Sequence, residues 1–197
     1  MAFPTGMISA DMVSQHFVVN RSSETLVESY GKPYYTKCLE LYPSSVEDVT
    51  TILKEATKFN RKIAIAGALM SQGKQAFPLK EQDFLIHLDS LNHVEIDPNN
   101  RIAKVGAGAL WSDVQEAANK HKLAVKVMQA SNIFSIGGSL SINCHGWDHK
   151  SGTLKETVRS LLVANAEGEI KRLFPGDELF DLVIGGLGGF AAILEAE

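Results

Sequence analysis

The segment from residue 134 to residue 149 contains the side chains best suited to chemistry in this chain. It reads FSIGGSLSINCHGWDH and gathers Asn143, His145 and Asp148 beside two aromatic residues. No hydrophobic period explains these polar groups as part of a core helix or strand, and the Gly137-Gly138 pair weakens any helix. Imidazole, carboxylate and carboxamide groups can bind a ligand or transfer a proton. We therefore take the segment as the first candidate site.

A metal site is one interpretation of this segment, because His145 and His149 are four residues apart and Cys144 and Asp148 adjoin them. Gly146 disfavours a single helical face, and no distant Cys/His pair completes a set of four ligands. A Ser/His/Asp hydrolase is also disfavoured, since the chain has no GxSxG elbow. We expect no bound metal, and a tightly packed structural loop with hydrogen-bonded histidines remains an alternative.

A second candidate is the loop of residues 67–73, which follows an apolar run and ends in Gly-Lys as a P-loop does. Five residues separate its glycines instead of four, and Gln75 stands where a P-loop needs Ser or Thr for magnesium. The segment 106–111 fails the Rossmann fingerprint because Trp111 replaces the third glycine. The loop can still form an anion-binding nest of backbone N–H groups. A plain surface turn is the alternative.

Regular elements are expected on both sides of this loop. The run 39–42 predicts a strand, and Ser44 and Glu47 have the capping-box spacing that begins a helix. Apolar residues then recur at helical intervals through residue 60, and a strand over 62–66 leads into the loop. This order is typical of a βαβ unit that presents a glycine-bounded loop.

A different arrangement is expected further along the chain. Strand-like runs at 84–88, 93–96 and 101–105 indicate antiparallel pairing, and a helix is predicted over 112–121 from the Ser112/Gln115 spacing. The runs 158–164 and 169–173 predict a hairpin. Residues 1–35 show no sustained period, and we expect an arm or a short helix near residues 24–30.

Composition excludes several classes of protein. Nineteen basic and 23 acidic residues give a net charge of −4 without a basic run, so we expect no nucleic-acid partner. The uncharged stretch 127–147 is long enough to span a bilayer, which takes roughly 20 residues, but it holds too many polar side chains for a transmembrane segment. The first residues lack signal-peptide features, and the two cysteines form no disulfide framework. A cytoplasmic protein is expected.

Five segments follow one another in a specific order: IAGALMSQG, VGAGALWSDV, SIGGSLSINCHGWDHKSG, VRSLLVANAEGEI and ELFDLVIGGLGGFAAIL. Together they resemble the FAD-binding domain of the vanillyl-alcohol oxidase family, also called the p-cresol methylhydroxylase (PCMH) type. The GG-x(6)-HG segment is most similar to the branch of decaprenylphosphoryl-ribose oxidase and the aldonolactone and alditol oxidases. The resemblance implies an α+β fold, a PCMH-type FAD-binding domain of two α+β subdomains with FAD between them. Residues 1–35 would form an N-terminal arm, about 36–90 the first subdomain and 91–197 the second.

The resemblance also implies which residues bind FAD. The family's pyrophosphate loop matches Ala66, Gly67, Ala68, Leu69, Met70, Ser71, Gln72 and Gly73, whose N–H groups from Gly67 to Gln72 would bind the diphosphate. The segment beside the ribityl chain and flavin ring matches Gly137, Gly138, Asn143, His145 and Gly146, and the backbone contact near adenine matches Ile193. Relatives often carry Arg-Gly at Ala66-Gly67 and Gly-Ile or Gly-Val at Ala191-Ala192, so this chain departs from the family pattern there.

Many relatives attach FAD covalently through a histidine of the pyrophosphate loop. The matching residue here is Met70, which cannot form that bond, and Cys144 does not match the cysteine that some relatives use. The resemblance therefore implies noncovalent FAD.

The family's catalytic residues come mainly from a substrate domain that follows the FAD domain, and this chain stops at Glu197, so we assign no catalytic residue. We expect the cofactor half of a flavin-dependent oxidase or dehydrogenase that oxidises a hydroxyl group of a small sugar or polyol. We also expect it to meet a partner domain or to self-associate. A non-catalytic nucleotide-binding or structural module that kept the fold is the alternative.

Overall fold

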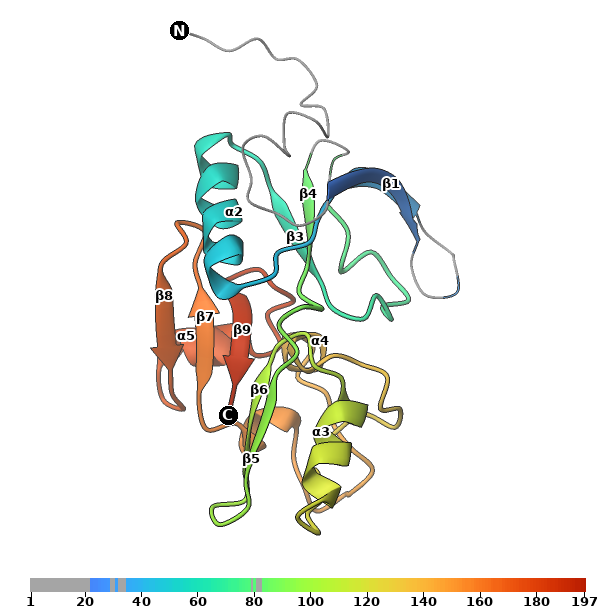
Figure 1. Ribbon diagram of the computed structural model, residues 1–197, viewed down its shortest axis with the longest axis vertical. Coiled ribbons are helices and arrows are strands. Elements are labelled where there is room, and N and C mark those ends of the chain that lie inside the picture. The colour runs from blue at the N-terminus through green and yellow to red at the C-terminus, as the bar shows by residue number, and fades with distance from the viewer. Residues whose placement is uncertain (1–21, 29–30, 32–34, 79, 81–82) are drawn as a thin grey trace, which may run out of the picture.

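Two β-sheets with different strand directions make up the fold (Figure 1). The computed structural model describes residues 22–28, 31, 35–78, 80 and 83–197. The first sheet has four strands in the order β1-β2-β4-β3, and the second has five in the order β5-β6-β9-β7-β8. The first sheet consists of β1 (Ser22–Glu28), β2 (Tyr35–Leu41), β3 (Ile63–Ala66) and β4 (Phe84–His87).

Strands β2, β4 and β3 of the first sheet are parallel, with β4 in the middle. Helix α2 (Val46–Lys58) makes the crossover from β2 to β3, which confirms the predicted βαβ order. Ser45 caps the helix by accepting from the Asp48 N–H, one residue later than the predicted Ser44/Glu47 pair. Our expectation that antiparallel pairing begins with residues 84–88 was wrong, because a crossover returns the chain in the same direction before β4.

Strand β1 corrects a second expectation. Residues 22–28 form a strand paired antiparallel with β2 over seven residues on each strand, whereas a helix was one alternative for residues 24–30. Pairing with a neighbouring strand overrides weak local preference. Part of the predicted N-terminal arm thus belongs to the first sheet.

The second sheet is antiparallel between all its neighbouring strands. Its strands are β5 (Val94–Asp97), β6 (Ile102–Gly106), β7 (Leu161–Ala164), β8 (Ile170–Leu173) and β9 (Ala192–Ala196). The predicted β7–β8 hairpin is confirmed. Around this sheet lie α3 (Trp111–Asn119), α4 (Ile136–Ser141), η1 (Leu154–Thr157) and α5 (Glu178–Val183). Asp113 caps α3 by accepting from the Leu110 N–H, so the helix starts earlier than the predicted Ser112/Gln115 pair.

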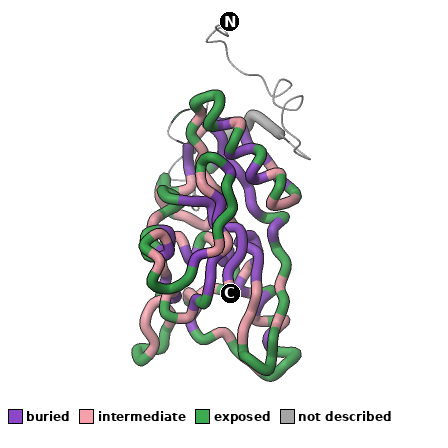
Figure 2. The backbone as a smooth tube through the Cα atoms, turned by 90° about the vertical axis from the view of Figure 1, so that its left-hand side faces the viewer, coloured by how far each residue is buried: buried purple, intermediate pink, exposed green. Residues whose placement is uncertain are grey.

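One hydrophobic core extends through both halves of the molecule. Leu39, Leu41, Phe84 and Ile86 point from one face of the first sheet toward α2, and the same cluster continues into residues of the second sheet such as Leu194. The buried segments run through the centre of the molecule between the two halves (Figure 2). The opposite face of the first sheet packs under the chain that follows β3, through a smaller cluster of Val27, Cys38, Ala66, Phe77 and Leu85. Alternation along the strands produces these two faces.

Candidate functional site

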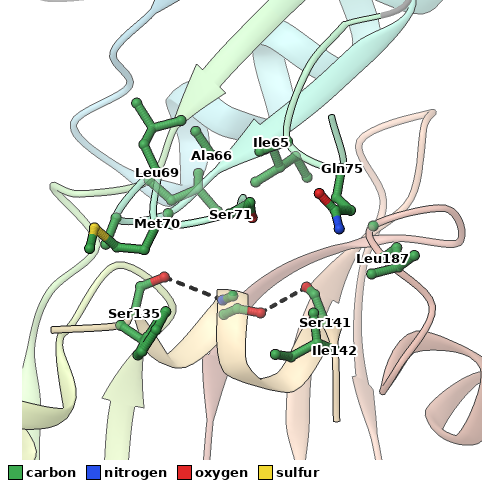
Figure 3. A pocket seen from close by; sticks show the side chains of 18 of the residues that line it. Ile65, Ala66, Leu69, Met70, Ser71, Gln75, Ser135, Ser141, Ile142 and Leu187 are labelled. Atoms are coloured by element: carbon green, nitrogen blue, oxygen red, sulfur yellow. Dashed lines mark hydrogen bonds between the residues drawn. The ribbon is translucent and has the colours of Figure 1, made fainter. Parts of the chain in front are cut away.

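A cavity of about 720 Å³ lies where the two sheets meet. Ligand sites in proteins typically occupy 300–1,000 Å³. Strand β3, the loop after it, helix α4 and the segment before β9 contribute its lining. Figure 3 shows the loop after β3 on one side of this space and α4 on the other.

The loop after β3 presents a row of unpaired backbone donors. Among the residues that the structure describes, none accepts a hydrogen bond from the backbone N–H groups of residues 67–73. Leu69 has a φ of 52°, so the chain takes a left-handed step within the loop. Successive N–H groups around such a step form the concave nest that binds anions. Because residues 67–72 line the cavity, these donors are available to a ligand inside it.

Gly67 is the point where the loop comes closest to α4. A Cβ atom at this position would overlap with Ser135 Oγ and lie 3.0 Å from Ser135 Cβ. Ser135 is 3% exposed and caps α4 by accepting from the Gly138 N–H, so it has little room to move. The absence of a side chain at Gly67 is therefore required for the two walls of the cavity to meet here.

Helix α4 was not expected, because Gly137-Gly138 weakens a helix. Tertiary contacts supply what local preference lacks: Ile136 N–H donates to Ala109 O and Gly137 N–H donates to Ala107 O. A Cβ atom at Gly137 would lie 3.0 Å from the Ala107 Cβ. The glycine thus lets the helix start against the segment that follows β6, and one face of the helix remains directed at the cavity.

The structure brings most of the predicted site residues together. Ten of them line the cavity: Ala66, Gly67, Ala68, Leu69, Met70, Ser71, Gln72, Gly137, Gly138 and Ile193. They come from three separate parts of the chain.

Four predicted residues, Gly73, Asn143, His145 and Gly146, are not among those that line the cavity. Asn143 Oδ1 instead accepts from the Lys155 N–H, and the exposed His145 ring lies 3.0 Å from the oxygen of Gly146. Gly146 packs on the backbone of Met128, so this segment lies behind the chain that carries Gln129 into the cavity. The short turn after α4, in which Asn143 has a φ of 48°, directs the chain away from the cavity.

Several lining residues were not predicted. One group precedes α4 and consists of Gln129, Ser131, Ile133, Phe134 and Ser135. A second group precedes β9 and consists of Leu187, Gly188 and Gly189. The Gly188-Gly189 pair of the second group is a usable signal, since paired glycines mark close backbone approach. No sequence pattern distinguishes Gln129 and Ser131 from ordinary loop residues.

The lining contains no charged side chain and no imidazole among the described residues. The cavity can therefore bind an anion only through dipoles, and it has no side chain suited to general acid–base catalysis. Cys144, beside the cavity wall, is also unsuited to covalent chemistry, because burial raises the pKa of its thiol to about 11. The arrangement is suited to holding a ligand that brings its own reactivity.

The part of the chain that the structure describes offers no metal site and no membrane-spanning helix. No three His, Cys, Asp or Glu side chains gather there in a way that could hold a metal ion. No helix there is long and apolar enough to cross a bilayer. A second cavity of about 510 Å³ lies between the second sheet and α3, and none of the predicted site residues lines it.

Comparisons with known proteins agree with this geometry. The family model described as "FAD binding domain" matches residues 39–173. L-gulonolactone oxidase of Bos taurus is 30% identical over 139 residues, which cover 69% of this chain and 31% of that protein. Decaprenylphosphoryl-beta-D-ribose oxidase of Mycolicibacterium smegmatis is 29% identical over 153 residues, covering 75% of this chain and 33% of the relative. The chain thus spans about a third of the length of these curated relatives.

The fold has a close counterpart among solved structures. A variant of cholesterol oxidase from Brevibacterium sterolicum superposes with a TM-score of 0.78 at 19% identity, covering 90% of this chain and 37% of that one. This likeness supports the expected α+β fold. Since the family model covers more than half of the residues, the chain belongs to the family of PCMH-type FAD-binding domains.

Proposed function

We propose that this chain is the cofactor-binding part of an FAD-dependent oxidoreductase that oxidises a hydroxyl group of a sugar or polyol. The observation that carries the proposal is the row of unpaired N–H groups at residues 67–72, which faces a cavity of about 720 Å³ between two sheets. A diphosphate is an anion that such a row can bind without a lysine or a metal ion. The neutral lining is consistent with a site that holds a cofactor instead of performing proton transfer.

The ten lining residues would hold FAD in one orientation. The N–H groups of residues 67–72 would bind the diphosphate, and Ser71 can add a hydroxyl donor. Gly137 and Gly138 would let the cofactor approach the backbone of α4, and Ile193 would lie near the adenine. We place the flavin ring at the Met70 end of the cavity, where Ile133 and Phe134 add apolar surface. Bound flavin supplies the hydride-accepting chemistry, while the protein orients it.

Asn143, His145 and Gly146 receive a different role in this proposal from the one first expected. They would support the flavin end of the cavity from behind, because Gly146 packs on Met128 and Cys144 lies against the backbone of Gln129. Gly73 would close the loop without touching the cofactor.

Noncovalent attachment follows from the side chains near the ring. Met70 has no ring nitrogen that could bond to the flavin, and Cys144 holds its thiol proton with a pKa of about 11. The choice of a sugar or polyol rests on the relatives, two of which are named as a lactone oxidase and a ribose oxidase.

Flavin release tests the proposal. The purified chain, supplied with FAD and freed of excess, is expected to show the absorption bands of bound flavin. Acid or heat precipitation should then leave the flavin intact in the supernatant, where chromatography identifies it as FAD. Flavin that stays with the precipitate would contradict noncovalent attachment. A folded chain that retains no flavin would instead favour a structural module that kept the fold.

A further inference from the structure

Gln129 has a side chain whose orientation is fixed by its neighbours. Its Oε1 accepts from the Trp111 indole N–H at 3.1 Å and lies 2.5 Å from the Ser139 hydroxyl. The indole N–H also donates to Ser139 Oγ at 2.8 Å, so the two oxygens share it. Because an indole nitrogen can only donate, the carboxamide oxygen of Gln129, and not its NH₂, is the end suited to face it. Trp111 is 5% exposed and Ser139 is fully buried, which keeps this pair of partners in place.

Fixing the oxygen leaves the carboxamide NH₂ of Gln129 without an acceptor among the described residues. Gln129 also lines the cavity, and the nitrogen of its NH₂ group is not one of the fully buried atoms that lack a partner, so it is accessible to solvent or to a ligand. A rigidly held polar group with two free N–H bonds therefore borders the space that a ligand would fill. In the neutral lining, few side chains can donate from a fixed position in this way.

The position of Gln129 along the cavity is set by α4. The Ser139 hydroxyl that touches Gln129 also lies 2.8 Å from Ser135 O, so Gln129 belongs to the N-terminal end of the helix. Figure 3 places Ser135 below Met70, whereas Ser141 and Leu187 lie at the other end. Gln129 thus lies at the Met70 end of the cavity. Phe134 adjoins Ser135 in the chain, and Met70 and Phe134 both line the cavity with apolar side chains that suit a flat ring system.

We propose that Gln129 is a positioning residue for the flavin ring, to which its NH₂ group donates a hydrogen bond. The inference rests on the proposed FAD binding. The flavin ring carries carbonyl oxygens and ring nitrogens that accept hydrogen bonds, and reduction adds electron density to them. A fixed donor consequently stabilises the reduced ring more than the oxidised ring and makes the reduction potential more positive. Trp111 and Ser139 act through Gln129 by holding its oxygen away from the ring.

Two substitutions at this position test the inference in the FAD-loaded chain. Gln129→Met keeps the length of the side chain and removes the donor. Gln129→Glu keeps an oxygen for Trp111 and Ser139 and puts a second oxygen where the NH₂ was. We expect both variants to bind FAD roughly three- to tenfold more weakly, which corresponds to the loss of one hydrogen bond. The reduction potential of the bound flavin should become more negative in both, and more so in Gln129→Glu.

Gln115→Met is the matched control. Unlike Gln129, Gln115 has both ends of its carboxamide engaged, since its NH₂ donates to Asn119 and its oxygen accepts from the Val125 N–H, and it does not line the cavity. We expect this variant to keep the potential and the absorption spectrum of the unaltered chain. Unchanged potential and spectrum in both Gln129 variants would overturn the inference while leaving FAD binding intact. An unaltered chain that binds no FAD would overturn the inference and the proposed function together.

Discussion

Backbone N–H groups, in place of charged side chains, are the groups with which this cavity can bind an anion. No Lys, Arg or His of the described part of the chain lines it, whereas residues 67–72 line it and their backbone N–H groups have no acceptor there. Such a site is insensitive to the titration of side chains but depends on backbone geometry. Gly67 controls that geometry, because Ser135 occupies the space that a side chain at residue 67 would need.

Gly67→Ala is expected to destabilise the fold and weaken FAD binding. Overpacking of this kind costs about 1–3 kcal/mol of unfolding free energy, and the strain falls on the loop that presents the N–H donors. Urea unfolding and a titration with FAD measure the two effects.

Two further variants separate strain at residue 67 from a general loss of glycine. Gly73→Ala is the control in the same loop, since the three atoms nearest to its new Cβ all belong to the flexible side chain of Gln75. Adding Ser135→Ala to Gly67→Ala removes the overlapping hydroxyl and should restore part of the binding. Equal losses in Gly67→Ala and Gly73→Ala, with no effect of Ser135→Ala, would show that the close contact at Gly67 is unimportant.

Part of the site was predictable at the level of residues. The glycine-bounded loop of residues 67–73 follows an apolar strand, and both features are visible in the sequence. The polar segment with His145 was equally conspicuous, but the left-handed turn at Asn143 takes it away from the cavity. Gln129 was not predictable, because its role depends on two hydrogen bonds to residues 18 and 10 positions away.

Elements with a strong period were the easier ones to predict. Helix α2 has an apolar face and a local cap, and the β7–β8 hairpin joins two neighbouring segments, so both depend on nearby residues. Helix α4 and strand β1 depend on distant partners instead: α4 begins against Ala107 and Ala109, and β1 pairs with β2. Sequence patterns do not encode such contacts in a short window.

Strand β9 connects the cavity to an ion-pair cluster on the second sheet. Ile193 lines the cavity, and two residues further Glu195 pairs with Arg172 at 2.7 Å and with Lys104 at 3.4 Å. Burial on its own would raise the pKa of Glu195, but the hydrogen bond from Arg172 and the charge of Lys104 outweigh it and hold the pKa below the usual value.

The lowered pKa of Glu195 predicts acid-dependent stability. A carboxyl group with a lower pKa in the folded state stabilises that state above the unfolded value of about 4.5, and this contribution is lost as the pH falls through the folded pKa. Glu195→Gln should therefore lower the unfolding free energy at pH 7 by on the order of 1 kcal/mol, a modest figure because Arg172 and Lys104 are partly exposed.

Urea unfolding measured between pH 3 and pH 7 checks this expectation. This pH range includes the values, roughly 4, at which unpaired carboxyl groups titrate. The difference between the Glu195→Gln variant and the unaltered chain should shrink below about pH 4.5. A difference that stays constant across the range would refute a role for ionised Glu195.

The molecule as a whole is a two-sheet unit with one core and its candidate cofactor cavity where the sheets meet. The family's α+β fold could be predicted from five sequence motifs that follow one another in a specific order. Each motif corresponds to an element that lies where the two sheets meet or packs beside that place. The chain spans about a third of the length of these relatives. The oxidation of a sugar or polyol hydroxyl group is therefore a proposal about the whole protein.

Amide hydrogen exchange tests the central claim most directly, because the N–H groups of residues 67–72 are the atoms assigned to the diphosphate. In the free chain these amides have no acceptor among the described residues and should exchange quickly. Saturation with FAD should slow their exchange, while the amides of β8, which does not line the cavity and pairs only with β7 among the described strands, keep their rates. Bound FAD that leaves the exchange at residues 67–72 unchanged would contradict the account.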